Sequence, residues 1–392
     1  MVKSTVCSLT VNCLHGTVKK AGLKGSRNGH LKPQTSNLKL IIMKIGLAGY
    51  SGSGVTTFLA LLSEDPELVN SHGRPEVRSI KVDDPRLDRQ VRLFSPKKIT
   101  PLREEVVELG DLRPSEGGGL RKETLARSAG LDALVLVLRG FDAPMSEGCR
   151  PAGELSREFE SLLQEFAIAD LMPVENRLER LGKEGKLSSA EGQLLTKLKN
   201  GLEEGIPIRA LGLDRDELRA LSGYNFLTLV PLTVVASLGA EGVGDLRYPD
   251  LAERCRHEGI SYVEIPTLAE FETLEIPEVE RGPFLADLGI KAPARERFMG
   301  VLFAQLRIAT FFTVGESEVR AWTVPEGTPA VKAAGKIHTD LERGFIRAEV
   351  ISGEECIALG GLEQAKKAGK LRIEGKDYIV KDGEIFHVRF NV

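Results

Sequence analysis

The sequence lacks any apolar run near the ~20 residues that a membrane-spanning helix requires, and its best candidate, Leu131–Leu138, has only the length of a strand. Its five cysteines are odd in number and widely spaced, and none belongs to a CxxC pair: Cys7, Cys13, Cys149, Cys255 and Cys356. This spacing argues against a disulfide framework and against a zinc site. We therefore expect a cytoplasmic protein with reduced thiols and no membrane partner.

The sequence also lacks a strong charge of either sign, although its charge is unevenly distributed. The formal net charge is -3, and residues 1–42 contribute seven bases and no acid, which leaves -10 for the rest of the chain. An acidic body argues against nucleic-acid binding over the whole surface, and we expect no DNA partner. A basic surface confined to one face remains possible. We interpret residues 1–42 as an extension upstream of a true start at Met43, with a targeting segment as the alternative.

Ordinary globular composition, with 42% hydrophobic and 28% charged residues, excludes a wholly disordered, collagen-like or coiled-coil protein. At roughly 150 residues per domain, 392 residues predict two or three domains. Short apolar strands alternate with helical patterns, and this alternation predicts a doubly wound α/β layer with a mostly parallel sheet. The predicted strands are Lys44–Gly49, Val106–Leu109, Leu134–Leu138 and two more within Tyr224–Ala236.

Between residues 151 and 221 the pattern becomes helical. Apolar residues step by four and three along Leu155, Phe159, Leu162, Phe166 and Ala169, and again by four along Ala190, Leu194, Leu198 and Leu202. A polar stretch separates the two segments. We predict an antiparallel helical hairpin inserted into the α/β domain, so that residues 43–150 and 222–309 are its two parts; two ordinary surface helices are the alternative.

Residues 310–392 have the pattern of a small α+β module that could fold alone. Its predicted strands are Arg320–Val324, Phe345–Ile351, Asp377–Val380 and Ile385–Val392, with a short helix over Glu363–Gly369.

A glycine-rich turn follows the first strand. Gly49, Gly54 and Thr56 have the spacing of a phosphate-binding loop, in which backbone N–H groups form an anion nest and the threonine hydroxyl ligates magnesium. The lysine of that motif is replaced by Val55. The glycines also fit a GxxGxxG dinucleotide pattern, and a purely structural tight turn is the third interpretation. Spacing alone leaves all three open.

Longer segments resemble the YchF / Obg-like ATPase family of translation-factor-class P-loop proteins. The segments with this resemblance are Asp84–Asp88 (DPRLD), Leu213–Leu229, Glu318–Val324, Gly335–Ile351 and Glu374–Val392. The resemblance implies a P-loop NTPase-type sheet, an inserted helical hairpin and a carboxy-terminal TGS module of the β-grasp fold. It also implies ATP or GTP with Mg²⁺ as cofactor and a ribosomal or RNA partner that is bound through the hairpin and the TGS module.

Several positions depart from the family pattern. Val55 replaces the phosphate-binding lysine, Glu108 the metal-side aspartate and Asp111 the glycine near the γ-phosphate. No threonine between Thr57 and Thr100 can act as the switch residue, and the base-reading segment falls on Ser237–Ala240. We therefore expect weak or absent nucleotide binding and turnover. A working ATPase or GTPase with an atypical loop, in which Arg74 or Arg78 reaches into the pocket, is the alternative.

From the resemblance to this family we derive three sets of candidate site residues. The degenerate nucleotide site comprises Gly49, Ser51, Gly52, Ser53, Gly54, Val55, Thr56, Thr57 and Ser237. The weak metal site comprises Thr56 and Glu108. The basic partner surface comprises His338, Arg343, Arg347, Lys366 and Lys367. We predict no catalytic residue.

Overall fold

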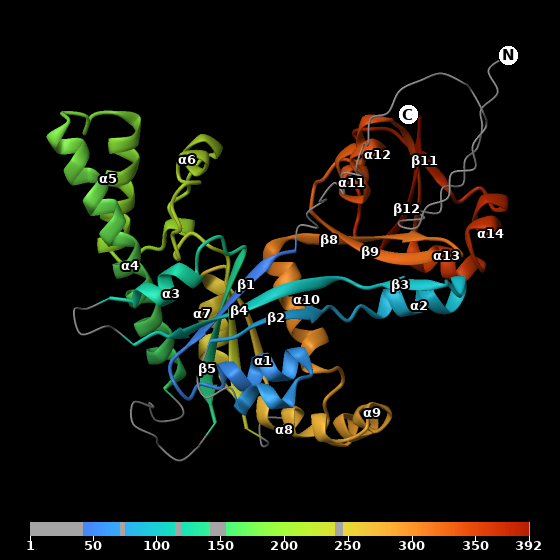
Figure 1. The fold of residues 1–392 in the computed structure, drawn as a ribbon, viewed down its shortest axis with the longest axis horizontal. Helices are drawn as coiled ribbons and strands as arrows, with labels where there is room; N and C mark the ends of the chain where they lie inside the picture. Colours follow the sequence, from blue (N-terminus) through green and yellow to red (C-terminus); the bar gives the residue numbers. More distant parts are fainter. Residues whose placement is uncertain (1–41, 71–74, 114–118, 142–153, 240–245, 392) are drawn as a thin grey trace, which may run out of the picture. The chain divides into compact units, whose positions relative to one another are not determined.

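The computed structural model describes residues 42–70, 75–113, 119–141, 154–239 and 246–391 (Figure 1). These residues form two compact units. The first comprises Ile42–Asp83 and Arg103–Arg307, and the second comprises Asp84–Leu102 and the carboxy-terminal segment that begins at Ile308.

A six-stranded sheet forms the centre of the first unit, in the order β2-β4-β1-β5-β6-β7. Strand β2 runs antiparallel to β4, and all other neighbours are parallel. Both faces of a parallel sheet are covered, which explains the continuous apolar runs in its central strands. The predicted doubly wound α/β class is confirmed. The strands are β1 (Lys44–Gly49), β2 (Val77–Lys81), β4 (Arg103–Asp111), β5 (Ala133–Gly140), β6 (Leu232–Leu238) and β7 (Ser261–Ile265).

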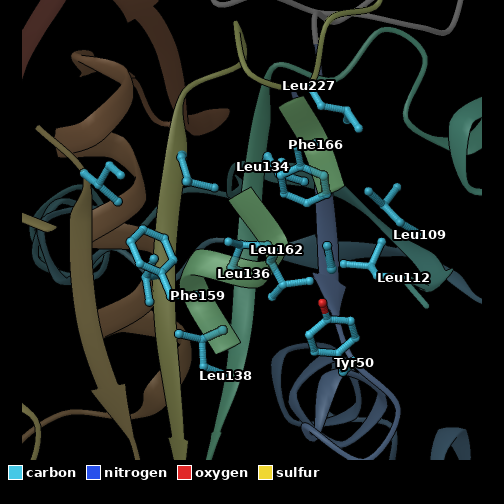
Figure 2. Close-up of a cluster of buried hydrophobic side chains, with 14 of the residues drawn as sticks. Tyr50, Leu109, Leu112, Leu134, Leu136, Leu138, Phe159, Leu162, Phe166 and Leu227 are labelled. Atoms are coloured by element: carbon cyan, nitrogen blue, oxygen red, sulfur yellow. The ribbon is translucent and has the colours of Figure 1, made fainter. Parts of the chain in front are cut away.

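Two groups of helices cover this sheet. On one face, α1 (Val55–Ser63) packs with α8 (Thr267–Glu272) and α10 (Ala294–Leu306), and the Phe58 and Phe298 rings meet edge to face at 5.1 Å. On the other face, the first half of α4 (Leu155–Lys183) and α7 (Pro249–His257) bury their apolar sides. Figure 2 shows Phe159, Leu162 and Phe166 of α4 against the leucines of β5. The apolar seam predicted along this helix is therefore confirmed.

The predicted hairpin is also present, but it begins later than expected. The second half of α4 packs against α5 (Ala190–Glu203) around a separate apolar cluster that includes Val174, Leu181, Leu195 and Leu198. The first half belongs to the core of the sheet instead. One continuous helix, α4, therefore contributes to both the sheet core and the hairpin core. For this reason no independent hairpin starts at the expected boundary, residue 151.

The prediction of two strands within Tyr224–Ala236 is wrong, because only β6 forms there. The backbone N–H groups of Leu227 and Thr228 donate to the Asp170 carboxylate of α4, at 2.9 and 2.7 Å, and the Thr228 hydroxyl donates at 2.7 Å. A side chain therefore takes the hydrogen bonds that a sheet ladder would have used. Asp170 is 2% exposed.

We expect the stability contributed by Asp170 to depend on pH. Burial raises its pKa from 3.8 to about 6 and outweighs the lowering effect of the hydrogen bonds from Thr228 and Leu227. The native chain then holds this proton more tightly than the unfolded chain, so the contribution is complete below about pH 4 and is lost as the pH rises through about 6. In urea unfolding, the free energy of unfolding of the wild type relative to that of Asp170→Asn should decrease as the pH rises from about 4 to about 6. A difference that stays constant with pH would contradict this assignment.

The second unit contains another six-stranded sheet, in the order β11-β10-β12-β8-β9-β3. Helix α11 (Ala330–Ile337) packs on one face, as in a β-grasp fold, and the α14 helix (Leu362–Lys367) confirms the short helix predicted there. The prediction of a strand over Asp377–Val380 is wrong, because this segment makes only an isolated bridge between Ile379 and Pro329. The strands are β3 (Lys98–Thr100), β8 (Ile308–Val314), β9 (Glu318–Pro325), β10 (Phe345–Ser352), β11 (Arg372–Glu374) and β12 (Glu384–Phe390).

Residues 84–102 belong to this second unit, although the expected domain boundaries place them in the α/β domain. Helix α2 (Pro85–Phe94) buries Leu87 against the opposite sheet face, and β3 pairs in parallel with β9. Arg86 forms an ion pair with Asp382, whose other carboxylate oxygen accepts the Thr310 N–H at 2.8 Å. The carboxy-terminal sheet is therefore completed by a segment more than two hundred residues earlier in the chain.

Candidate functional site

The glycine loop lies between β1 and the amino terminus of α1, where its backbone requires glycine. Gly52 and Gly54 have φ angles of +82° and +91°, a region that side chains other than glycine rarely adopt. At Gly49 a Cβ atom would lie 2.4 Å from the Ser53 hydroxyl and 2.6 Å from the Val137 carbonyl oxygen. The spacing seen in the sequence thus corresponds to a tightly folded loop at a helix amino terminus, the geometry of an anion nest.

This loop forms one wall of a cavity of about 280 Å³. All the loop residues predicted for nucleotide binding line it, with the single exception of Ser53. Tyr50, Pro75 and Gly110 line it as well, although the sequence analysis did not select them. The described lining consists of Gly49, Tyr50, Ser51, Gly52, Gly54, Val55, Thr56, Thr57, Pro75, Glu108 and Gly110.

Ser53 and Ser237, which we predicted as nucleotide-site residues, are buried behind the loop. Ser237 is 1% exposed, and its hydroxyl donates to the Thr267 hydroxyl at 2.9 Å. A Cβ atom at Gly54 would lie 3.0 Å from the Ser237 hydroxyl, so Ser237 supports the back of the loop. Ser53 is 2% exposed, and its hydroxyl has no hydrogen-bond partner among the described residues. In the rest of the predicted base-reading segment, Leu238 ends β6 and Gly239 follows it, whereas Ala240 and the neighbouring Glu241 lie outside the described residues.

The two residues predicted to bind a metal do meet in the cavity. The Thr56 hydroxyl donates to the Glu108 carboxylate at 2.5 Å, and the Glu76 backbone N–H donates to the other carboxylate oxygen at 3.0 Å. Glu108 is only 5% exposed. One carboxylate and one hydroxyl supply two oxygen ligands, whereas Mg²⁺ requires near-octahedral coordination, usually completed by water and substrate phosphates. Among the described residues, no group of three or more His, Cys, Asp or Glu side chains could hold a metal ion.

The cavity wall carries a negative charge and no positive one among the residues that the structure describes. Its lining includes no lysine or arginine, and Glu108 is its single charged side chain. Arg78, an alternative source of positive charge, instead forms ion pairs with Glu76 at 2.8 Å and Asp65 at 3.5 Å. The second alternative, Arg74, lies outside the described residues. The nest geometry fits a phosphate, but the charge distribution does not fit a tightly bound triphosphate.

Tyr50 connects the loop to α4. Its hydroxyl lies 2.9 Å from the Ser161 hydroxyl, within hydrogen-bonding distance, and its ring packs into the cluster shown in Figure 2. The sequence analysis could have selected Tyr50, because an aromatic residue inside a glycine-rich turn is unusual. Gly110, next to Asp111 at the end of β4, could likewise have been selected. Nothing comparable marks Pro75 in the sequence.

The residues predicted as one basic partner surface lie in separate places. His338 precedes α12 (Thr339–Arg343), where its Nδ1 accepts the Asp340 N–H at 3.1 Å. Arg343 ends that helix, which packs on the same sheet face as α11. Lys366 and Lys367 end α14, which packs on the opposite face. The two pairs therefore lie on opposite sides of the sheet.

Arg347 lies on β10, directly opposite Arg389 of β12. Arg389 forms an ion pair with Glu349, which leaves the Arg347 guanidinium exposed with no ion pair among the described residues. The structure thus divides the predicted side chains between two faces of the sheet, so that all five do not make one continuous basic patch. No described helix is both long and apolar enough to cross a membrane.

Comparison with known proteins gives consistent matches along the chain. Residues 308–391 match the family model YchF-GTPase_C, described as a protein of unknown function (DUF933). The ribosome-binding ATPase YchF of Haemophilus influenzae is 38% identical over 362 residues, covering 89% of this chain and 99% of that protein. Its namesake in Bacillus subtilis is 33% identical, covering 81% and 90%. Obg-like ATPase 1 of Caenorhabditis elegans is 31% identical, covering 89% and 92%.

A solved structure agrees with the fold. The structure of the Schizosaccharomyces pombe YchF GTPase matches with a TM-score of 0.75 and covers 88% of this chain and 97% of that one. Sequence identity is 24%, so this likeness supports the architecture alone.

Proposed function

The chain belongs to the YchF family, and on that premise we propose that it associates with the ribosome while binding and hydrolysing nucleotide weakly or not at all. Curated relatives bear the name ribosome-binding ATPase. The proposal keeps the ribosomal partner of those relatives and departs from their ATPase activity. It makes the α/β unit mainly a scaffold that positions the hairpin and the carboxy-terminal unit.

The charge of the cavity is the observation that supports weak or absent nucleotide binding and hydrolysis. Phosphoryl transfer depends on cations placed around the transferring phosphate, and a triphosphate also needs them for tight binding. The described lining supplies none, because Val55 stands at the lysine position and Arg78 is held by Glu76 and Asp65. Glu108 adds a negative charge at the same wall. The backbone nest alone would give weak phosphate binding.

A working ATPase or GTPase with an atypical loop is the second candidate. The contact between Thr56 and Glu108 favours it, because it places a hydroxyl and a carboxylate where a magnesium site would need them. Calorimetric titration of the purified protein with ATP and GTP, each with Mg²⁺, separates the two candidates. We expect dissociation constants weaker than about 10 μM and no turnover. Tighter binding, together with Mg²⁺-dependent hydrolysis that Thr56→Ala abolishes, would establish the second candidate.

Ribosome association can be tested independently of the nucleotide. We expect the full-length protein to co-sediment with ribosomal subunits at moderate salt, and to the same extent with or without ATP and Mg²⁺. The reason is that a cavity whose described lining has no positively charged side chain should bind triphosphate too weakly to couple that binding to docking. Binding that requires ATP would contradict the scaffold interpretation, and an absence of binding would contradict the ribosomal partner.

A further inference from the structure

The helix α9 (Glu278–Asp287) exposes an apolar side that no other described residue covers. Val279, Pro283 and Ala286 are exposed and recur at helical spacing along one side, and Val279 is 84% exposed, more than any other large apolar residue described. Phe284, 47% exposed, borders this stripe. Single exposed apolar residues are common, but a stripe along one helix marks a candidate docking surface. We call Val279, Pro283, Phe284 and Ala286 the α9 face.

Acidic side chains surround the α9 face. The segment from α8 to the end of α9 exposes five carboxylates without an ion-pair partner among the described residues: Glu272, Glu275, Glu278, Glu280 and Asp287. The single base within α9, Arg281, donates to the Leu274 and Ile276 carbonyls, on either side of Glu275, and lies 3.7 Å from Glu64. Five exposed carboxylates thus outnumber the bases in and just after this segment, Arg281 and the exposed Lys291, and the surface around the apolar stripe is net negative.

Helix stability accounts for only part of this charge. Glu278 and Glu280 lie in the first turn of α9, where a negative charge interacts favourably with the helix dipole. Asp287 lies at the opposite end, where the same dipole disfavours a carboxylate. Glu272 and Glu275 precede the helix altogether. Helix stability therefore does not account for the charges of Glu272, Glu275 and Asp287.

The backbone of α9 adds a hydrogen-bond acceptor at the same place. Pro283 has no N–H group, so the Val279 carbonyl, four residues earlier, lacks its usual α-helical donor. A carbonyl oxygen beside carboxylates favours an incoming N–H or ammonium group. Apolar side chains, negative charge and a carbonyl that lacks its usual i+4 donor thus occur together on one helix.

We propose that the α9 face docks a basic protein segment of the ribosome, one that presents lysine or arginine around an apolar side chain. This inference rests on the ribosome association proposed above and assigns it a contact. RNA does not fit this face, because its phosphates would be repelled by the five carboxylates. Docking here would therefore differ in chemistry from any contact made by basic residues of the carboxy-terminal unit.

Co-sedimentation of full-length variants with ribosomal subunits tests the assignment. We expect Val279→Asp to weaken binding by about tenfold or more, since a central apolar contact would be replaced by a charge. The matched control is Val69→Asp, a 40%-exposed valine outside the face, which should leave binding unchanged. Glu278→Lys/Glu280→Lys should also weaken binding, whereas the control Glu105→Lys/Glu123→Lys should not. All four positions in these double variants are exposed, so folding should be preserved.

The outcomes separate this inference from the function on which it rests. Weakening by both α9 variants, with a photo-cross-linker at position 279 attached to a ribosomal protein, supports it. Stronger binding of the lysine variant, or a cross-link to RNA, would overturn it in favour of an RNA contact. Loss of a dimer upon Val279→Asp would assign the face to a second copy of this chain instead. Unchanged binding by both variants would overturn the docking face alone. Failure of the wild type to sediment would remove both the ribosomal partner and this inference.

Discussion

Replacing Val55 with lysine should raise the affinity of this protein for ATP or GTP roughly ten- to 150-fold, which corresponds to about 1.5–3 kcal/mol for one charge-assisted hydrogen bond. Val55 is the first residue of α1 and lines the cavity, so a longer side chain there can extend toward bound phosphates. The glycine nest around it is already formed. The substitution therefore supplies the positive charge that the described lining lacks, and titration calorimetry with each nucleotide and Mg²⁺ measures the gain.

Val55→Met provides the matched control, since methionine lengthens the side chain without adding charge. It should leave nucleotide affinity near that of the wild type. An equal gain in both variants would show that side-chain length, not charge, limits binding. If Val55→Lys has no effect, the ammonium group could be neutralised by Glu108, and Val55→Lys/Glu108→Gln then tests that explanation. No gain in the double variant would mean that the residue at position 55 does not limit nucleotide affinity.

Truncating Leu87 to alanine should destabilise the carboxy-terminal unit by about 2–5 kcal/mol, the usual cost of removing a buried leucine side chain. Leu87 lies on α2, is 3% exposed and packs with Phe312, Val319 and Ile385. Leu187→Ala is the control, because Leu187 is 50% exposed and should change stability by less than about 0.5 kcal/mol. Urea unfolding followed by Trp322 fluorescence reports on this unit, since the single tryptophan of the chain lies on β9.

The same packing predicts how fragments of the chain behave. Residues 308–392 alone would expose the sheet face that α2 covers and would lack the β3 strand. We expect this fragment to unfold without cooperativity or to aggregate, whereas the same fragment with residues 84–102 joined by a flexible linker should fold. Cooperative unfolding of the shorter fragment would show that α2 contributes little. The sequence-based expectation that the module could fold alone would then hold after all.

Local patterns in the sequence were sufficient for much of the architecture. The four-and-three spacing of Leu155, Phe159 and Leu162 predicted a helix with one buried face, and that face is buried. The glycine spacing of the loop predicted a tight turn at a helix amino terminus, and the positive φ angles of Gly52 and Gly54 agree. These predictions succeeded because backbone geometry and helical periodicity depend on neighbouring residues.

Errors arose where distant residues decide the local structure. Tyr224–Val230 has strand-like composition, yet Asp170, more than fifty residues away, takes its backbone hydrogen bonds. The basic residues of the carboxy-terminal unit are close in sequence, yet α12 and α14 place them on opposite sheet faces. Composition contains no information about which side of a sheet a helix will cover.

The sequence by itself determined which chemical groups are available, and above all that Val55 stands where the phosphate-loop spacing predicts a lysine. The tertiary structure decided how those groups are used: Ser53 and Ser237 are turned away from the cavity, Glu108 is brought to Thr56, and α2 is joined to a sheet at the other end of the chain. The physical reason is that side-chain chemistry is fixed residue by residue, whereas burial and pairing depend on long-range packing.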